Sequence, residues 1–232
     1  MAGEPKGDRK RFRRLPADQR REEILDAAVR LVGRVPEVSI DDVAAAAGTS
    51  RASVYRNFDG RKGLYAATLR RICQRLEATL GEIPQGPPSE CLEAGVRTYV
   101  DFAVEYGAVL GTGLPGSPEV QREVIGELRQ VMCRWVFATL GGTPPEPVLE
   151  TAVHAWVAGL EWTILEWRRH HRLERSALEA LLNRQLFLTL ATASSGARLD
   201  WLASVEPQDG PYARQLRETA SLLGSSSLLR GR

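Results

Sequence analysis

The sequence has few of the features that would place the chain in a membrane or in a disulfide framework. Its three cysteines, Cys73, Cys91 and Cys133, are odd in number and far apart, and none has C-x-x-C spacing. We therefore expect neither disulfides nor a zinc site, and interpret them as small buried residues. No apolar run approaches the roughly 18 to 20 uncharged residues that a membrane helix needs. Alternating apolar and polar residues, which would predict β-strands, are also missing. These absences favour a cytoplasmic protein made of helices.

Lysine is scarce as well, since it supplies three of the 31 basic residues. The total of 31 basic against 29 acidic residues hides a strong asymmetry. Residues 1–76 contain 17 basic and 10 acidic side chains, net +7, whereas residues 77–232 contain 14 and 19, net −5. A chain of 232 residues with 43% apolar residues can form one large or two modest domains. The two parts should therefore face different partners.

Apolar residues at helical spacing run through most of the chain and predict an all-α fold of about nine to ten helices. The expected helices cover residues 17–32, 40–47, 51–57, 61–80, 90–110, 118–140, 147–170 and 175–193, with a further one at 211–223. The expected organisation is a basic arm (1–14), a three-helix DNA-binding domain (15–60), a connecting helix (61–80), a larger helical domain (81–193) and a partly helical tail (194–232).

Two of the short helices are joined by three residues that include Gly48, which predicts a helix-turn-helix whose second helix lies in the DNA major groove. Ser39 and Ser50 can cap these helices. In the second helix, Val54 and Phe58 are four residues apart and can face the core. The residues left to face outward include no acid: Arg51, Ala52, Ser53, Tyr55, Arg56 and Asn57.

The chemistry of this helix suggests individual roles. Arg51 lies in the first turn, where its planar guanidinium can bind guanine through two hydrogen bonds, and is the best specificity candidate. Tyr55 and Lys62 are better suited to phosphates, while Ser53, Arg56 and Asn57 could contact either a base or a phosphate. The basic arm could add minor-groove contacts. The complete set of candidate DNA contacts is Ser39, Thr49, Ser50, Arg51, Ala52, Ser53, Tyr55, Arg56, Asn57 and Lys62.

Residues 21–28, 39–58 and 60–65 together resemble the TetR family of bacterial transcriptional regulators. The resemblance implies a homodimer on a palindromic operator, and a divergent C-terminal domain that binds a small molecule and dimerises through its last two long helices. Residues 33–37 depart from the family's usual turn and leave the start of the second helix open. The positions that commonly touch DNA in the family are Ser39, Arg51, Ser53, Tyr55, Asn57 and Lys62.

The last two long helices have distinct apolar patterns. Small residues recur at Ala152, Ala155, Gly159 and Thr163, and leucines recur every fourth residue at Leu178, Leu182, Leu186 and Leu190. Such stripes suit helix–helix contact. They fit the dimer interface that the resemblance implies, through helices near 147–170 and 175–193, and they equally fit an intramolecular core.

A ligand site is expected among aromatic and polar residues of the apolar helices. The candidates are Phe102, Tyr106, Trp135, His154, Trp156, Glu161 and Trp162, each of which could instead be an ordinary core residue. No catalytic constellation, metal-ligand cluster or cofactor motif with the required context is found. The sequence thus predicts a ligand-responsive repressor. An activator, a regulator without ligand and an enzyme fused to a DNA-binding module are the alternatives.

Overall fold

The computed structural model describes residues 16–33, 38–112, 118–141 and 146–193. Within these ranges the chain is all-helical and contains no strand, which confirms the predicted fold class. The eight helices are α1 (Ala17–Val32), α2 (Ile40–Ala46), α3 (Arg51–Phe58), α4 (Gly60–Gly81), α5 (Pro88–Thr112), α6 (Pro118–Thr139), α7 (Pro147–His170) and α8 (Arg175–Ala193).

The predicted count of nine to ten helices exceeds the eight of the described ranges. Each of the eight corresponds to one of the helices expected from apolar spacing. The expectation holds because the apolar residues at helical spacing form the buried face of each helix. The further helix expected at 211–223 lies outside the described residues, as do the basic arm (1–14) and the rest of the tail. Residues 34–37, which include most of the unusual turn before α2, lie outside them too.

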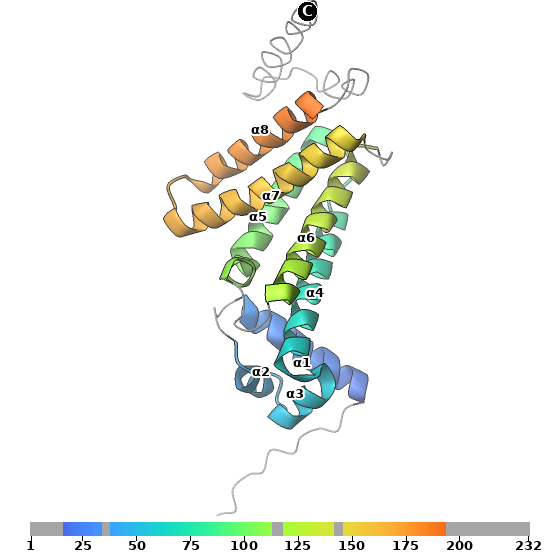
Figure 1. Cartoon of the computed structure of the whole chain (residues 1–232), viewed down its shortest axis with the longest axis vertical. Coiled ribbons are helices and arrows are strands. Elements are labelled where there is room, and N and C mark those ends of the chain that lie inside the picture. Colours follow the sequence, from blue (N-terminus) through green and yellow to red (C-terminus); the bar gives the residue numbers. More distant parts are fainter. Residues whose placement is uncertain (1–15, 34–37, 113–117, 142–145, 194–232) are drawn as a thin grey trace, which may run out of the picture.

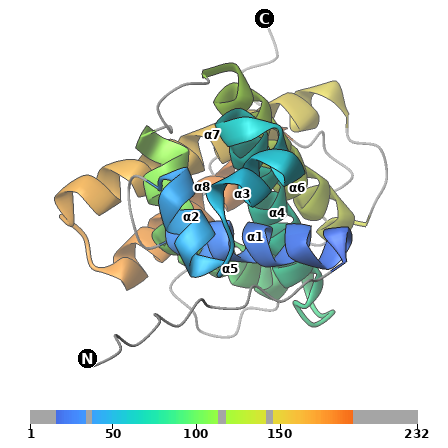
Figure 2. The same cartoon turned by 90° about the horizontal axis from the view of Figure 1, so that it is seen from below.

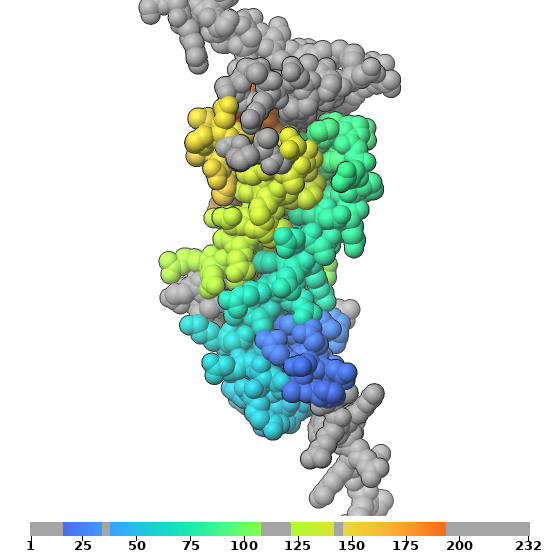
Figure 3. Space-filling view, turned by 90° about the vertical axis from the view of Figure 1, so that its right-hand side faces the viewer, coloured from blue at the N-terminus to red at the C-terminus, as the bar shows by residue number. Residues whose placement is uncertain are grey.

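The helices form an elongated molecule (Figures 1 and 3), with α1, α2 and α3 at one end and α7 and α8 toward the other. Helix α4 starts among the first three helices and runs away from them beside α5 and α6. It packs against α1 and α3 at its start and against α5 and α6 farther along. One continuous helix therefore contacts both the N-terminal helices and the larger helical part.

The first helix joins α4 through the apolar stripe that its sequence predicts. Ile24, Leu25 and Ala28 of α1 are buried in the same hydrophobic core as Leu69 and Ile72 of α4. Burying an aliphatic side chain contributes about 1.5 to 3 kcal/mol relative to leaving it exposed. The N-terminal helices thus have a substantial core, and α4 is part of it.

A tight corner connects α3 to α4. Asp59 has a positive φ of 49° and Gly60 one of 80°, so the chain turns within two residues and α4 begins at Gly60. Gly63, in the first turn of α4, lies so close to the carbonyl of Phe58 that an added Cβ would overlap it. Because glycine alone leaves room for this approach, Gly63 fixes the direction of α4 relative to α3.

The leucine row of α8 belongs to the intramolecular core. Leu178, Leu182, Leu186 and Leu190 are all buried within the single chain, where α8 packs against α7 and α5. The sequence left a dimer interface open for this row. The structure assigns the row to the chain's own core, because the positions at spacing four follow the face that α8 turns toward α5 and α7.

The cysteines differ in their surroundings. Cys73 and Cys133 are buried as expected, and burial raises their thiol pKa to about 12 and about 11, so both stay protonated near neutral pH. For Cys91 the expectation was wrong: it lies half-exposed in the first turn of α5, with its thiol 3.5 Å from the carbonyl of Pro84. None of the described helices is long and apolar enough to cross a membrane.

Candidate DNA-reading surface and ligand cavity

The end of the molecule opposite α7 and α8 presents the helix-turn-helix to solvent (Figure 2). On α3, Arg51, Ala52, Tyr55 and Arg56 are exposed as predicted, while Val54 and Phe58 are buried against the other N-terminal helices. The exposed face of α3 therefore carries two arginines and a phenol and no carboxylate. This composition suits contact with phosphates and base edges.

Two of the residues expected to face outward do not do so freely. Ser53 is buried, with 8% of its surface exposed, because it lies beside Val54 on the side of α3 that packs inward. Asn57 is half-buried, and its amide donates a hydrogen bond of 2.7 Å to the carbonyl of Ser53. The expectation that Ser53 faces outward is corrected, because residues 53, 54, 57 and 58 share one face of a 3.6-residue helix.

The predicted caps position the two helices. The Ser39 hydroxyl accepts a hydrogen bond of 3.1 Å from the Asp42 amide and donates one of 2.6 Å to the Asp42 carboxylate, which also accepts from the Ser39 amide. These bonds lower the pKa of Asp42. Ser50 accepts from the Ser53 amide at 3.2 Å. Both serines are exposed, but their hydroxyls already have partners in the helix caps.

The principal specificity candidate also has an intramolecular partner. Arg51 lies 3.4 Å from Asp41 of α2, and its guanidinium carbon is 5.8 Å from the centre of the Tyr55 ring. A hydrogen bond with Tyr55 and the charge of Asp41 raise the pKa of Arg51. Thr49 is half-exposed in the turn, and Lys62 is exposed in the first turn of α4. Arg51 is therefore exposed but has an intramolecular partner in Asp41.

A cavity of about 200 Å³ lies between α5, α6 and α7. It includes Glu161 and Trp162, two of the predicted ligand residues. Sequence reasoning missed its other polar members, Tyr99 and Arg129, because each reads as an ordinary position of an amphipathic helix. The remaining lining is small or aliphatic: Ala103, Gly107, Ile125, Leu128, Ala158, Ile164 and Leu165.

The polar groups of this cavity form one hydrogen-bonded set. Glu161 accepts a bond of 2.8 Å from the guanidinium of Arg129 and lies 3.4 Å from the hydroxyl of Tyr99. Burial raises the pKa of Glu161, while the bonds from Arg129 and Tyr99 oppose that rise. The pKa of Tyr99 is raised well above its ordinary value, mainly by burial. The arrangement offers a recessed carboxylate, bonded to Arg129 and Tyr99, in a pocket whose remaining walls are mostly apolar.

The other predicted ligand residues lie elsewhere. Phe102 and Tyr106 line a separate groove of about 420 Å³ between α4 and α5, together with Arg75. Trp135 lies against Gly95, and its indole donates to the carbonyl of Leu80 at 3.2 Å, which makes it a packing residue. His154 and the buried Trp156 line neither space. The seven candidates therefore do not form one site, because α5, α6 and α7 turn them toward different neighbours.

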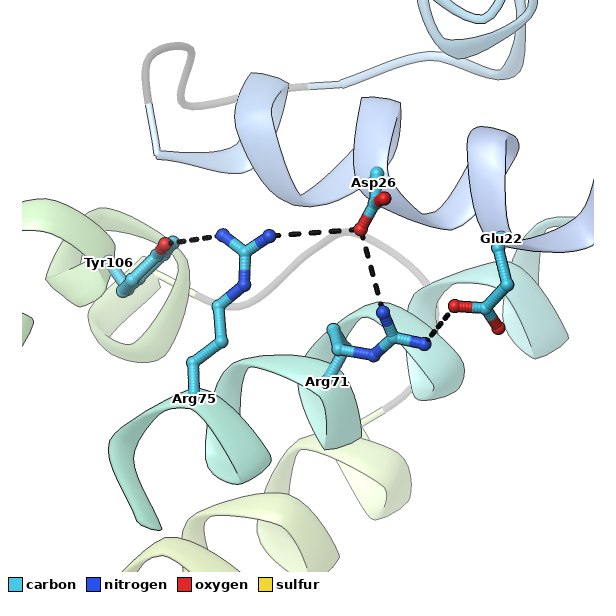
Figure 4. A network of polar contacts seen from close by, with 5 residues as sticks. All are labelled: Glu22, Asp26, Arg71, Arg75 and Tyr106. Carbon is cyan, nitrogen blue, oxygen red and sulfur yellow. Dashed lines mark hydrogen bonds and ion pairs between the residues drawn. The ribbon is translucent and has the colours of Figure 1, made fainter. Parts of the chain in front are cut away.

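A network of charged residues connects the N-terminal helices to α4 and α5 (Figure 4). Glu22 and Asp26 of α1 face Arg71 and Arg75 of α4. Arg71 pairs with Glu22 at 2.5 Å and with Asp26 at 3.5 Å, and Arg75 lies 3.7 Å from Asp26. Arg75 also donates a hydrogen bond of 3.2 Å to the hydroxyl of Tyr106 on α5. Arg75 therefore both lines the groove between α4 and α5 and forms an ion pair with α1.

One face of α7 is apolar, rich in small residues and open to solvent in the single chain. Ala155 and Gly159 are exposed, and a Cβ added at Gly159 would meet nothing within 4 Å among the described residues. Val148 and Trp162 on α7 and Leu188 on α8 are exposed as well. The stripe of small residues is therefore available for contact with another helix, in contrast to the leucine row of α8.

Comparison with known proteins gives consistent relatives for both parts. A family model described as bacterial regulatory proteins of the tetR family matches residues 24–68, and one described as a tetracyclin repressor-like C-terminal domain matches residues 88–189. A tetR-family transcriptional regulator from Streptomyces coelicolor, known as a crystal structure, is 30% identical with a TM-score of 0.75, and the alignment covers 90% of this chain and 100% of that one.

Two mycobacterial proteins are also similar. The uncharacterized HTH-type transcriptional regulator Rv1255c of Mycobacterium tuberculosis is 27% identical over 180 residues, which cover 75% of this chain and 86% of that protein. The HTH-type transcriptional repressor LfrR of Mycolicibacterium smegmatis is 29% identical over 93 residues, which cover 40% of this chain and 48% of LfrR. The match to LfrR thus spans about half of that repressor.

Proposed function

This chain belongs to the TetR family of bacterial regulatory proteins, and on that premise we propose that it is a ligand-responsive transcriptional repressor. It binds a palindromic operator as a homodimer and leaves it when a small molecule occupies the cavity between α5, α6 and α7. The observation that carries the proposal is the exposed, acid-free face of α3, with Arg51, Tyr55 and Arg56, at the end of a chain whose other end holds that cavity.

The helix-turn-helix supplies the DNA contacts. Arg51 reads a base edge from the first turn of α3, and Arg56 contacts a base or a phosphate. Tyr55, Lys62 and the backbone amides at the start of α4 contact phosphates. Ser39, Thr49, Ser50 and Ala52 lie at the same surface. Ser53 packs on the buried side of α3, and Asn57 bonds to the carbonyl of Ser53 within the same helix.

The homodimer forms through the small-residue face of α7. Exposed Ala155 and Gly159 let a partner helix approach closely, and Trp162 and Leu188 extend the apolar surface beside them. Two copies related by a two-fold axis would present two α3 helices to successive major grooves, about 34 to 36 Å apart. This spacing is the quantity that a ligand must change.

The ligand acts through α4. A molecule in the cavity pushes on α5 and α6, both of which pack against α4. Arg71 and Arg75 transmit a movement of α4 to Glu22 and Asp26 of α1, and hence to the helix-turn-helix. Operator affinity falls because the two recognition helices then depart from the spacing of the grooves.

The test measures binding to the DNA upstream of the protein's own gene, by gel shift or fluorescence anisotropy. We expect specific binding by a dimer, and a loss of roughly 5- to 150-fold for Arg51→Ala, the discrimination expected of one bidentate arginine. Arg134→Ala, an exposed arginine on α6 and away from α3, is the matched control. A transcription assay then separates repression from activation. Specific binding that Arg51→Ala leaves unchanged would contradict the role of α3.

A further inference from the structure

The ion pair inside the cavity is asymmetric. Glu161 comes from α7 and has 14% of its side chain exposed, whereas Arg129 comes from α6 and has 43% exposed. The carboxylate also has a second neighbour, since the hydroxyl of the buried Tyr99 lies 3.4 Å away. Glu161 is therefore held in place by its surroundings, while the guanidinium of Arg129 reaches in from the surface.

This asymmetry decides which partner a ligand can replace. A buried carboxylate left without a positive partner is strongly unfavourable, whereas an arginine near the surface regains water when it leaves. A molecule that enters the cavity can displace Arg129 at small cost, provided that it brings a positive charge of its own to Glu161. A carboxylate ligand would instead pair with Arg129 and leave two acidic groups together inside an apolar space.

We propose that the cavity binds a small lipophilic organic cation, whose protonated nitrogen takes the place of Arg129 at Glu161. Its apolar body lies against Ala103, Leu128 and Ile164, which line the same space. Trp162 is on the cavity wall, where its ring can contact the cation. The inference rests on the proposed function only in taking this cavity as the effector site.

The volume limits the size of the molecule. About 200 Å³ is below the roughly 300 to 1,000 Å³ of pockets for drug-sized ligands, so a single ring with a short aminoalkyl chain is the expected scale. Among the residues that line this cavity, Arg129 and Glu161 are the charged ones. The guanidinium of Arg168 on α7 lies against Gly107 at the wall of this space, and Glu161 is the one anionic anchor among the lining residues.

The test compares three probes with the same ring and chain length on the full-length protein: phenethylammonium, phenethyl alcohol and phenylpropionate. Calorimetry and thermal shift should show binding of the ammonium in preference to the other two. Glu161→Gln should weaken ammonium binding by about 30-fold or more, the loss expected when one member of a buried charge pair is removed. Arg129→Gln should strengthen it, because the competing guanidinium is gone.

The opposite pattern would overturn the inference: preference for the carboxylate, loss of binding in Arg129→Gln, or no ammonium binding to either the unaltered protein or Arg129→Gln. The double variant Arg129→Gln/Glu161→Gln controls for folding, because it removes both charges together and leaves neither without a partner. It should melt near the unaltered protein and fail to bind the ammonium. A double variant that keeps the ammonium affinity would equally contradict the inference.

Failure of the cation-binding inference and failure of the proposed repressor function would give different experimental results. The operator gel shift of unliganded Arg129→Gln tests DNA binding without reference to any ligand. If the ammonium binds through Glu161 but does not release the operator, the cation site stands and the proposed ligand response is wrong. If the operator is bound specifically but the protein prefers the carboxylate probe or does not bind the ammonium, the proposed repressor stands and the cation inference is wrong.

Discussion

The guanidinium of Arg75 donates a hydrogen bond of 3.2 Å to the hydroxyl of Tyr106, which joins α4 to α5 at the level of the N-terminal helices. The same guanidinium lies 3.7 Å from Asp26 of α1. The ring of Tyr106 also lies near the end of α1, because a Cβ added at Gly33, the residue that follows this helix, would be 3.6 Å from it. Arg75 therefore contacts both α1, through Asp26, and α5, through Tyr106.

Removing this hydrogen bond should cost stability in a way that depends on Arg75. We expect Tyr106→Phe to lower the free energy of unfolding by about 0.5 to 1.5 kcal/mol, the net value of one hydrogen bond, as measured by urea denaturation. The same substitution in an Arg75→Gln background should have a smaller effect, since Arg75, one of the two hydrogen-bond partners of Tyr106 beside Glu105, is already absent. Strictly additive effects would show that the two residues do not interact.

The carboxylate of Asp41, which lies beside Arg51, should lower the affinity of the protein for DNA. Asp41 lies 3.4 Å from the guanidinium of Arg51. Asp41→Asn therefore frees Arg51 and removes a negative charge from the surface that we propose faces DNA. Affinity for non-operator DNA should rise roughly two- to fivefold, consistent with the strength of exposed ion pairs. Its salt dependence should steepen, because one more cation reaches the phosphates. Glu82→Gln, exposed at the end of α4, is the control and should leave both quantities unchanged.

The corner between α3 and α4 should not tolerate a side chain at its closest approach. Gly63→Ala places a Cβ on the carbonyl of Phe58, and we expect a loss of about 1 to 3 kcal/mol in the free energy of unfolding. Gly126→Ala is the matched control in α6, where nothing among the described residues lies within 4 Å of the added Cβ. That variant should gain about 0.5 to 1 kcal/mol from the higher helix propensity of alanine. Equal effects of the two substitutions would argue against the tight corner.

The open face of α7 should control assembly. Gly159→Glu places a charge on the small-residue stripe without an intramolecular clash among the described residues, so the fold should be kept while the dimer dissociates. Light scattering after size exclusion should change from the mass of two chains to that of one, and operator affinity should fall with it. Ala138→Glu on the exposed face of α6 should remain dimeric. A dimer that persists in Gly159→Glu would place the interface elsewhere.

The hydrogen-bonded cap of α2 should make the free energy of unfolding depend on pH. Hydrogen bonds from Ser39 lower the pKa of Asp42 in the folded chain, so the cap contributes fully above the ordinary pKa of an aspartate. The contribution is lost as the pH falls through the lowered value in the folded state. Ser39→Ala should cost about 0.5 to 2 kcal/mol at neutral pH, as the loss of a helix cap usually does. Its difference from the unaltered protein should shrink in acid; a constant difference would show that Asp42 is not part of the cap.

The sequence by itself determined the helices and the helix-turn-helix among them. Apolar spacing, serine caps and glycine breaks act within a few residues, so they could be read along the chain, and the caps at Ser39 and Ser50 are present as predicted. Ser53 was misplaced, because a helix of eight residues buries a wider face than Val54 and Phe58 alone suggest. The residue types of the acid-free α3 were apparent from composition alone.

Only the tertiary structure decided which side chains meet between helices. Arg129 and Glu161 are 32 residues apart, and Arg75 and Asp26 are 49 apart, so no local pattern pairs them. Packing also separated two stripes that looked alike along the chain, since Leu178 and its repeats face the chain's own core while Ala155 and Gly159 stay open. Short-range propensities select the helices, whereas burial of their faces against one another selects the contacts, and the cavity follows from those contacts.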